Sequence, residues 1–185
     1  MDLLNAVNTV LPYLGEHVIT RIEGAQHPTV DLILAAIERQ RTTLLVDGWW
    51  FNELTLTLPV NTGSQIDVPT EVLTVYGIDC TVSIDGEKFY DLELGTRYFT
   101  KPIKVKLIRD IAFDRLPAQC ALYLTYLAAT EVYLADYGAD ATLTSLQVLA
   151  ERNLISLRQE NLRNRRYNSR TVALRNSTYH RITHR

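Results

Sequence analysis

The fold is decided by the stretch LLVDGWWFNELTLTLPV, residues 44–60. Before it, apolar side chains recur every three or four residues from Val30 to Leu45, which predicts a helix over residues 29–46. After it, leucines from Leu54 onward alternate with threonines, which predicts a strand with one buried face. Gly48 separates the two patterns and ends the helix. A helix that passes directly into a strand indicates an α+β fold.

The sequence on either side extends this layout. A short helix is expected over residues 3–14, with Asp2 as its N-cap. Asp85-Gly86 is a preferred two-residue hairpin turn. The remaining short apolar runs that predict strands are residues 66–68, 72–76, 80–84, 88–92 and 101–109. Helical spacing returns after Asp114, a candidate cap for a helix that starts near Leu116 and closes at residues 137–138, and a last helix begins after Asp140.

These elements predict a bundle of about four helices with a small antiparallel β module between the second and third helix. We expect one domain over residues 1–162, helical in residues 1–52 and 111–162, with the β module in residues 53–110. Residues 163–185 contain mostly Asn, Ser, Thr and Arg. Because this segment has too little apolar surface to fold alone, we expect an extended arm that orders on assembly.

Charge is divided unevenly along the chain. The formal net charge of the 185 residues is -2, but residues 1–149 hold 10 Lys+Arg against 19 Asp+Glu, a balance of -9. Residues 150–185 hold nine Arg against two Glu, a balance of +7. Arg suits bidentate contacts with carboxylates and phosphates. The expected partner of residues 163–185 is therefore an acidic protein or a nucleic acid.

Several classes of protein are excluded or disfavoured. With 46% hydrophobic and 22% charged residues, the composition is that of a globular protein. No apolar run reaches the ~18 residues of a membrane span, and the N-terminus has no basic region typical of a secretory signal. The four His and the two cysteines, Cys80 and Cys120, form no metal-ligand motif, and both cysteines are interpreted as buried apolar residues. No phosphate-binding glycine motif occurs, so we expect no cofactor, no metal and no catalytic residue.

Three features of the sequence have two possible interpretations each. The aromatic residues Trp49, Trp50 and Phe51 are a stacking platform for nucleic acid or, preferably, a structural junction that packs the bundle against the β module. The acid pairs Asp85/Glu87 and Asp91/Glu93 are a glycosidase-like pair of carboxylates or, preferably, a solvated strand face. The arginine run that starts at Arg163 binds phosphates or docks on an acidic protein surface, and composition does not separate these two.

Particular residues resemble the tail tubular protein A family, the head-to-tail adaptors of short-tailed bacteriophages. The resemblance rests on two blocks taken in order, Gly48-Trp49-Trp50-Phe51-Asn52 after a helix and Asp114-Arg115-Leu116-Pro117 before another. Further matches are residues 6–8, 14–16, 66–69 and 128–129, so that the resemblance covers roughly residues 5–160.

The resemblance implies a structural protein without catalysis. Such adaptors form a ring, typically of about twelve copies, under the portal vertex of the virion. The ring joins the portal protein to a tail nozzle of the tail tubular protein B type, and tail fibres are a further candidate partner. Viral DNA passes through the lumen without specific binding. Assembly is expected in the host cytoplasm.

The charge division fits this role. An acidic body repels DNA from a channel in which it must slide. A basic arm, repeated in every copy, fastens the ring to the portal by multivalent contacts. The residues predicted to pair with portal carboxylates are Arg163, Arg165, Arg166, Arg170 and Arg175. The alternative function is a nucleic-acid-binding protein whose arginine tail contacts phosphates; a glycan-cleaving enzyme is a third class without a placed catalytic constellation.

Overall fold

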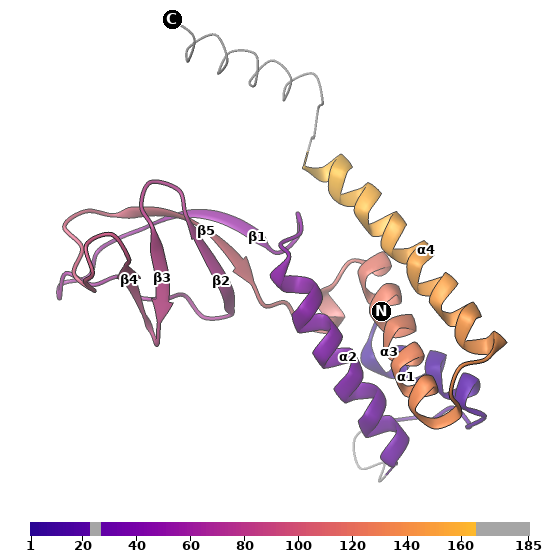
Figure 1. Ribbon diagram of the computed structural model, residues 1–185. Coiled ribbons are helices and arrows are strands. Elements are labelled where there is room, and N and C mark those ends of the chain that lie inside the picture. The colour runs from indigo at the N-terminus through magenta and orange to yellow at the C-terminus, as the bar shows by residue number, and fades with distance from the viewer. Residues whose placement is uncertain (23–26, 166–185) are drawn as a thin grey trace, which may run out of the picture.

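A computed structural model describes residues 1–22 and 27–165. Within these residues it contains four α-helices, two short 3-10 helices and five strands. Figure 1 shows two lobes, in which α1 to α4 form a helical lobe and the strands form a β module that projects from the end of α2. The predicted α+β class is therefore confirmed, with the antiparallel strands placed between α2 and α3. Of the predicted arm, residues 163–185, the part from residue 166 on lies outside the described residues.

The first helix is shorter than predicted. Helix α1 runs over Leu3–Val10, and a 3-10 helix, Leu11–Leu14, follows it. Pro12 explains the change, because proline has no N–H to donate within an α-helix and its ring clashes with the preceding turn. The predicted N-cap is confirmed, since the Asp2 carboxylate accepts a hydrogen bond from the Asn5 N–H at 2.7 Å.

Helix α2, Pro28–Val46, agrees with its prediction to within one residue. It presents a buried side to the other helices and an exposed side on which Leu32 and Val46 remain accessible. At its end, Gly48 has a φ of +73°, a conformation that favours glycine, and a side-chain carbon there would lie 2.7 Å from Ile108. The turn into the β module therefore requires a glycine.

The β module consists of a three-stranded antiparallel sheet and a hairpin. The sheet has the order β1-β5-β2, and the hairpin pairs β3 with β4. The hairpin turn is centred on Gly86-Glu87, one residue later than predicted, because Asp85 pairs with Lys88. Residues 66–68 contribute a single bridge at Asp67 rather than a strand. The strands are β1 Glu53–Leu58, β2 Val72–Gly77, β3 Val82–Asp85, β4 Lys88–Asp91 and β5 Ile103–Arg109.

Helices α3, Ala118–Tyr137, and α4, Ala141–Asn164, complete the helical lobe. The proposed cap Asp114 is wrong, because this residue lies in the 3-10 helix Phe113–Arg115 and Pro117 occupies the cap position of α3. The predicted start of the last helix is confirmed: the Asp140 carboxylate accepts a hydrogen bond from the Leu143 N–H at 2.8 Å. Helix α4 continues two residues beyond Leu162, the last residue of the predicted domain.

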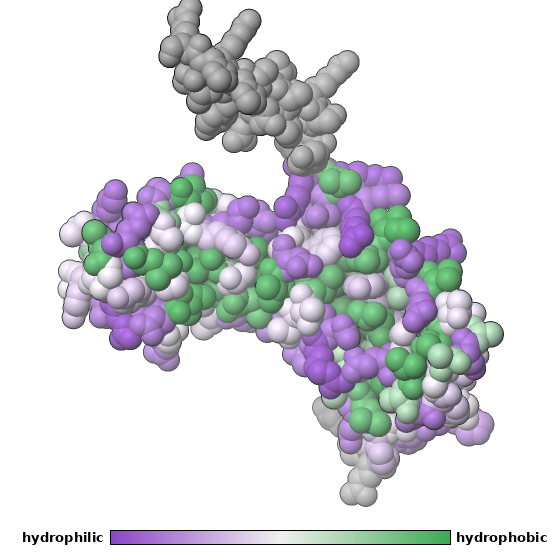
Figure 2. Space-filling model, in the orientation of Figure 1, coloured by the Kyte–Doolittle hydropathy of each residue, from purple (hydrophilic) through white to green (hydrophobic). Residues whose placement is uncertain are grey.

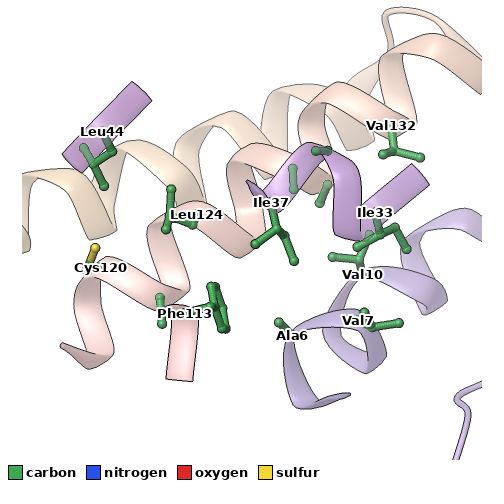
Figure 3. Close-up of a cluster of buried hydrophobic side chains, with 14 of the residues drawn as sticks. Ala6, Val7, Val10, Ile33, Ile37, Leu44, Phe113, Cys120, Leu124 and Val132 are labelled. Carbon is green, nitrogen blue, oxygen red and sulfur yellow. The ribbon is translucent and has the colours of Figure 1, made fainter. Parts of the chain in front are cut away.

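The buried apolar residues form two cores, one in each lobe. The larger core joins α1, α2, α3 and α4, and Figure 3 shows side chains that three of these helices contribute to it, among them Val7, Ile33, Ile37 and Leu124. Cys120 belongs to this core, whereas Cys80 is only half-buried, so the interpretation of both cysteines as buried holds for one of them. The second core lies in the β module and consists of Leu58, Ile66, Val82, Phe89, Phe99, Ile103, Val105 and Leu107.

Candidate assembly surfaces

The predicted aromatic junction lies between α2 and β1. Trp49 is buried in the helical core, and its indole N–H donates to the Leu44 carbonyl at 2.8 Å. Trp50 and Phe51 pack partly buried against the same core, with their rings edge to face at a centroid distance of 4.9 Å. The ring of Trp49 is therefore occupied within the fold and does not offer a free face for a base.

Asn52 is the central residue of this turn, and sequence reasoning did not single it out. Its side chain is fully buried and donates to the carbonyls of Leu45, at 2.9 Å, and Arg109, at 3.1 Å. Its side-chain oxygen accepts the Trp49 N–H at 2.7 Å. One amide thus joins the end of α2, the aromatic turn and the end of β5. The signal in the sequence was a polar residue placed directly between an aromatic run and the start of a strand, where backbone groups that turn inside the fold need partners.

Arg41 makes a second connection between α2 and the segment after β5. Arg41 is only 6% exposed. Its guanidinium contacts Asp110 and donates a hydrogen bond to the Ile111 carbonyl at 2.6 Å. Glu38 accepts from the Arg41 Nε at 2.9 Å. The hydrogen bond from Arg41 lowers the pKa of the Glu38 carboxyl, and the same contact raises the pKa of Arg41 despite its burial. Both groups therefore remain charged, which satisfies a cation that would otherwise be costly to bury.

The C-terminal turn of α4 also reaches the junction. Arg165 donates to the Gly48 carbonyl at 2.9 Å and to the Glu53 carboxylate at 2.6 Å, and Lys106 lies 2.9 Å from the same carboxylate. The Asn161 side chain accepts the Trp50 N–H at 3.1 Å. Through these contacts, the last turn of α4 is attached to the start of β1.

The five arginines predicted to dock on the portal do not share one environment. Arg165 is engaged within the chain, by the contacts just described. Arg163 is exposed on α4 and makes no ion pair with any residue that the structure describes. Arg166, Arg170 and Arg175 lie outside the described residues, so their role stays a prediction.

A groove runs between α3 and α4. Near the junction it widens into a cleft of about 380 Å³, whose lining includes Asp47, Arg158 and Asn161. A second hollow of about 260 Å³ continues it toward Glu151 and shares Tyr123 and Leu154 with the first. Burial raises the pKa of the Tyr123 hydroxyl, which therefore stays protonated and uncharged.

The acidic pairs of the β module have structural partners. Asp91 is buried and accepts the N–H groups of Glu93, at 2.8 Å, and Leu94, at 2.9 Å. Glu93 accepts the Thr81 hydroxyl at 2.6 Å, and Asp85 pairs with Arg97. The expectation of a solvated strand face is wrong for Asp91, because its carboxylate caps the turn that follows β4.

The exposed apolar side chains of the described residues include two groups that each lie on a single part of the fold. One covers the tip of the β module, where Leu92, Leu94 and Tyr98 are all more than half exposed and Leu94 is 76% exposed. The other follows α4 through Val148, Ile155 and Leu162. Figure 2 shows apolar residues scattered over both lobes among polar ones. Exposed apolar side chains gathered on one element are typical of surfaces that contact another protein.

Within residues 1–22 and 27–165, no group of three or more His, Cys, Asp or Glu side chains is arranged to hold a metal ion. In the same part of the chain, none of the helices has the length and apolarity needed to cross a bilayer.

The described residues thus form two lobes that are joined by a buried polar junction, and each lobe carries exposed apolar side chains. The sequence model of the tail tubular protein family matches residues 4–167, and the chain belongs to this family. It is 32% identical over 171 residues to tail tubular protein A of Klebsiella phage KP34, with 91% of both chains covered. The chain is therefore a structural protein of a bacteriophage tail, as its resemblance indicated, and a component of the virion.

Proposed function

We propose that the chain forms a closed homo-oligomeric ring of about twelve copies that joins the portal protein to the tail nozzle. The observation that carries this proposal is the similarity to tail tubular protein A along nearly the whole chain, both lobes included. The ring lies at the portal vertex, forms part of the channel for DNA retention and ejection, and is assembled in the host cytoplasm. Tail fibres are a further candidate partner.

The charge of the body supports a conduit. Residues 1–149 carry a balance of -9, and many copies around one channel multiply the repulsion of a polyanion. DNA would therefore slide past the wall without a specific contact. The exposed apolar tip of the β module, with Leu92 and Leu94, is the surface that we assign to the tail nozzle.

The arginine-rich C-terminus is the proposed contact with the portal. Arg163, Arg166, Arg170 and Arg175 would pair with portal carboxylates in every copy. Arg165 would serve the same contact only by leaving Glu53, so we assign it to the junction first.

A truncation that ends at residue 165 tests the portal contact. It keeps the whole of α4 and the Arg165–Glu53 contact, so the described fold should be retained. We expect the truncated chain to lose attachment to purified portal in a pull-down, and the full chain to lose it progressively as salt rises. Undiminished attachment of the truncated chain at low salt would contradict portal docking by this segment.

Mass measurement tests the ring itself. Sedimentation and negative-stain microscopy of the full chain, alone and with purified portal, should show a closed ring in at least one condition. A chain that stays monomeric in both conditions contradicts the adaptor proposal.

A further inference from the structure

The apolar stripe on α4 consists of Val148, Ile155 and Leu162, which are 61%, 48% and 53% exposed. Seven residues correspond to nearly two helical turns, so the three side chains lie in one row along the helix. The buried side chains of α4, such as Leu146 and Leu157, lie on the opposite face and pack into the helical core. At 1.5 Å per residue, the stripe extends about 21 Å along the helix axis. About half of each of these side chains therefore remains open to another surface.

A complementary surface lies on the other side of the helical lobe. Helix α3 packs against α2 on one side and against α4 on the other, as Figure 1 shows. The exposed face of α2 carries Leu32, Ala35 and Val46, two larger apolar residues and a small one. Between α2 and α3 this face contains a hollow of about 120 Å³, lined by Leu32, Arg39, Glu131, Val132, Ala135 and Asp136. An apolar row and a small hollow are the two halves of a knobs-into-holes contact between helices.

The charges of the two surfaces are also complementary. Helices α2 and α3 together hold four carboxylates and two arginines, and both arginines, Arg39 and Arg41, already pair within the chain. Asp31 and Asp136 make no ion pair with any described residue. Helix α4 has three arginines against two glutamates, and its Arg152 and Arg158, beside the stripe, make no ion pair within residues 1–22 and 27–165. With three arginines and two glutamates, one of which, Glu151, also flanks the stripe, α4 has a formal balance of +1, whereas α2 and α3 together have a balance of -2, a combination that orients two chains on encounter.

We propose that the α4 stripe of one copy packs on the α2/α3 surface of the next copy. The occupant of each surface is a second copy of this chain. Because the two surfaces are different and lie on opposite sides of the lobe, each copy uses both, and the contact continues from copy to copy until the ring closes. This inference rests on the proposed ring and specifies which faces build it.

Single charges introduced at the centre of each surface test the interface. The variants Ile155→Asp and Leu32→Asp change exposed side chains, so the fold should be retained, as checked by far-UV circular dichroism. Each variant alone should show at least a roughly tenfold weaker self-association than the wild type. The matched control is Ile78→Asp, the same change at an exposed isoleucine just after β2, which should leave the ring intact.

A mixture of the two variants gives the sharper result. The Ile155→Asp chain keeps an intact α2/α3 surface, and the Leu32→Asp chain keeps an intact α4 stripe. Mixed in equal amounts, they should form a heterodimer that grows no further, because only one productive contact remains. Two variants that form rings like the wild type, or a mixture that yields no heterodimer, would overturn the interface while leaving the ring proposal standing.

Disulfide trapping decides the same question at the level of residues. Cys80 is replaced by Ser, whereas Cys120 can remain, because it is buried and its burial raises the thiol pKa to about 12. In this background, Ile155→Cys mixed with Leu32→Cys should give a covalent dimer, and Ile78→Cys mixed with Leu32→Cys should not. A dimer from Ile155→Cys alone would indicate a two-fold contact between α4 helices and overturn the proposal. If the wild-type chain never self-associates, the proposed ring is contradicted. If the mixed Ile155→Cys and Leu32→Cys chains form no disulfide, the proposed interface is contradicted, whether or not the ring forms.

Discussion

At the scale of single residues, the two lobes are connected by polar side chains that are buried or paired. Asn52 supplies three hydrogen bonds to backbone groups, and Arg41 supplies a buried cation with two carboxylate partners. Such groups fix geometry, because a donor or acceptor left without its partner inside the protein carries the full cost of its desolvation. These hydrogen bonds therefore help to fix the position of the β module relative to α2.

Removing the Asn52 amide should destabilise the protein. Asn52→Ala leaves the Leu45 and Arg109 carbonyls and the Trp49 N–H without partners, and we expect a loss of about 2–4 kcal/mol in the free energy of unfolding. Urea denaturation measures this loss. Asn5→Ala, at an exposed position, is the matched control and should change the stability by less than about 0.5 kcal/mol. Equal effects of the two substitutions would contradict the role assigned to Asn52.

The pair Glu38–Arg41 predicts part of the acid dependence of stability. The pKa of Glu38 is lowered in the folded state from its ordinary value of 4.5, so the unfolded chain binds its proton more readily. The contribution of this carboxylate is therefore complete above that value and is lost as the pH falls through the folded pKa. Glu38→Gln should lower the free energy of unfolding at pH 7 by less than about 1 kcal/mol, since the carboxylate is largely exposed.

Thermal unfolding at several pH values measures this effect. The stability difference between Glu38→Gln and the wild type should shrink as the pH is lowered below 4.5. Glu160→Gln, which changes a carboxylate with no ion pair among the described residues, is the control. A difference for Glu38→Gln that is the same at pH 3 and pH 7 would show that the pair does not titrate as the structure implies.

At the scale of elements, local sequence patterns predicted most of the helices and strands. They did not predict the contacts between residues that are far apart in the chain. The period of apolar residues placed α2 within one residue of its observed start, because that signal is contained in the helix itself. The attachment of α4 to the junction joins Arg165 to Gly48, 117 positions apart, and nothing local to either residue indicates it. The predicted helix over residues 3–14 failed at Pro12, where the rule against proline within a helix outweighs the apolar pattern.

The connection between β2 and β3 depends on a close approach of two backbone segments. A side-chain carbon at Gly77 would lie 1.7 Å from the Cys80 carbonyl oxygen, and no rotation of a side chain can relieve a contact with backbone. Gly77→Ala should therefore displace this loop and cost at least about 3 kcal/mol, at the upper end of the range for overpacking. Gly63→Ala, whose added carbon would meet only the Asn61 side chain at 3.4 Å, is the matched control.

Because the protein has two cores, the effect of Gly77→Ala should be confined to one lobe. Hydrogen exchange should become faster in β2 and β3, most of whose apolar side chains belong to the core of the β module, and change little in α1 and α3. Faster exchange spread evenly over both lobes would contradict the separation of the cores.

At the scale of the whole molecule, the uneven charge allows the proposed adaptor and the nucleic-acid-binding alternative to be tested against each other. Residues 166–185 contain five arginines and no acidic residue, so truncation after residue 165 changes the formal net charge from -2 to -7. If the chain lines a DNA channel, neither the full chain nor the truncated one should retard double-stranded DNA in a gel shift near 150 mM salt, because the acidic body opposes binding. If the arginine-rich segment binds phosphates directly, the full chain should retard DNA, binding should fall steeply as salt rises, and truncation should abolish it. The second outcome, from a chain that forms no ring, would favour the nucleic-acid-binding function over the adaptor.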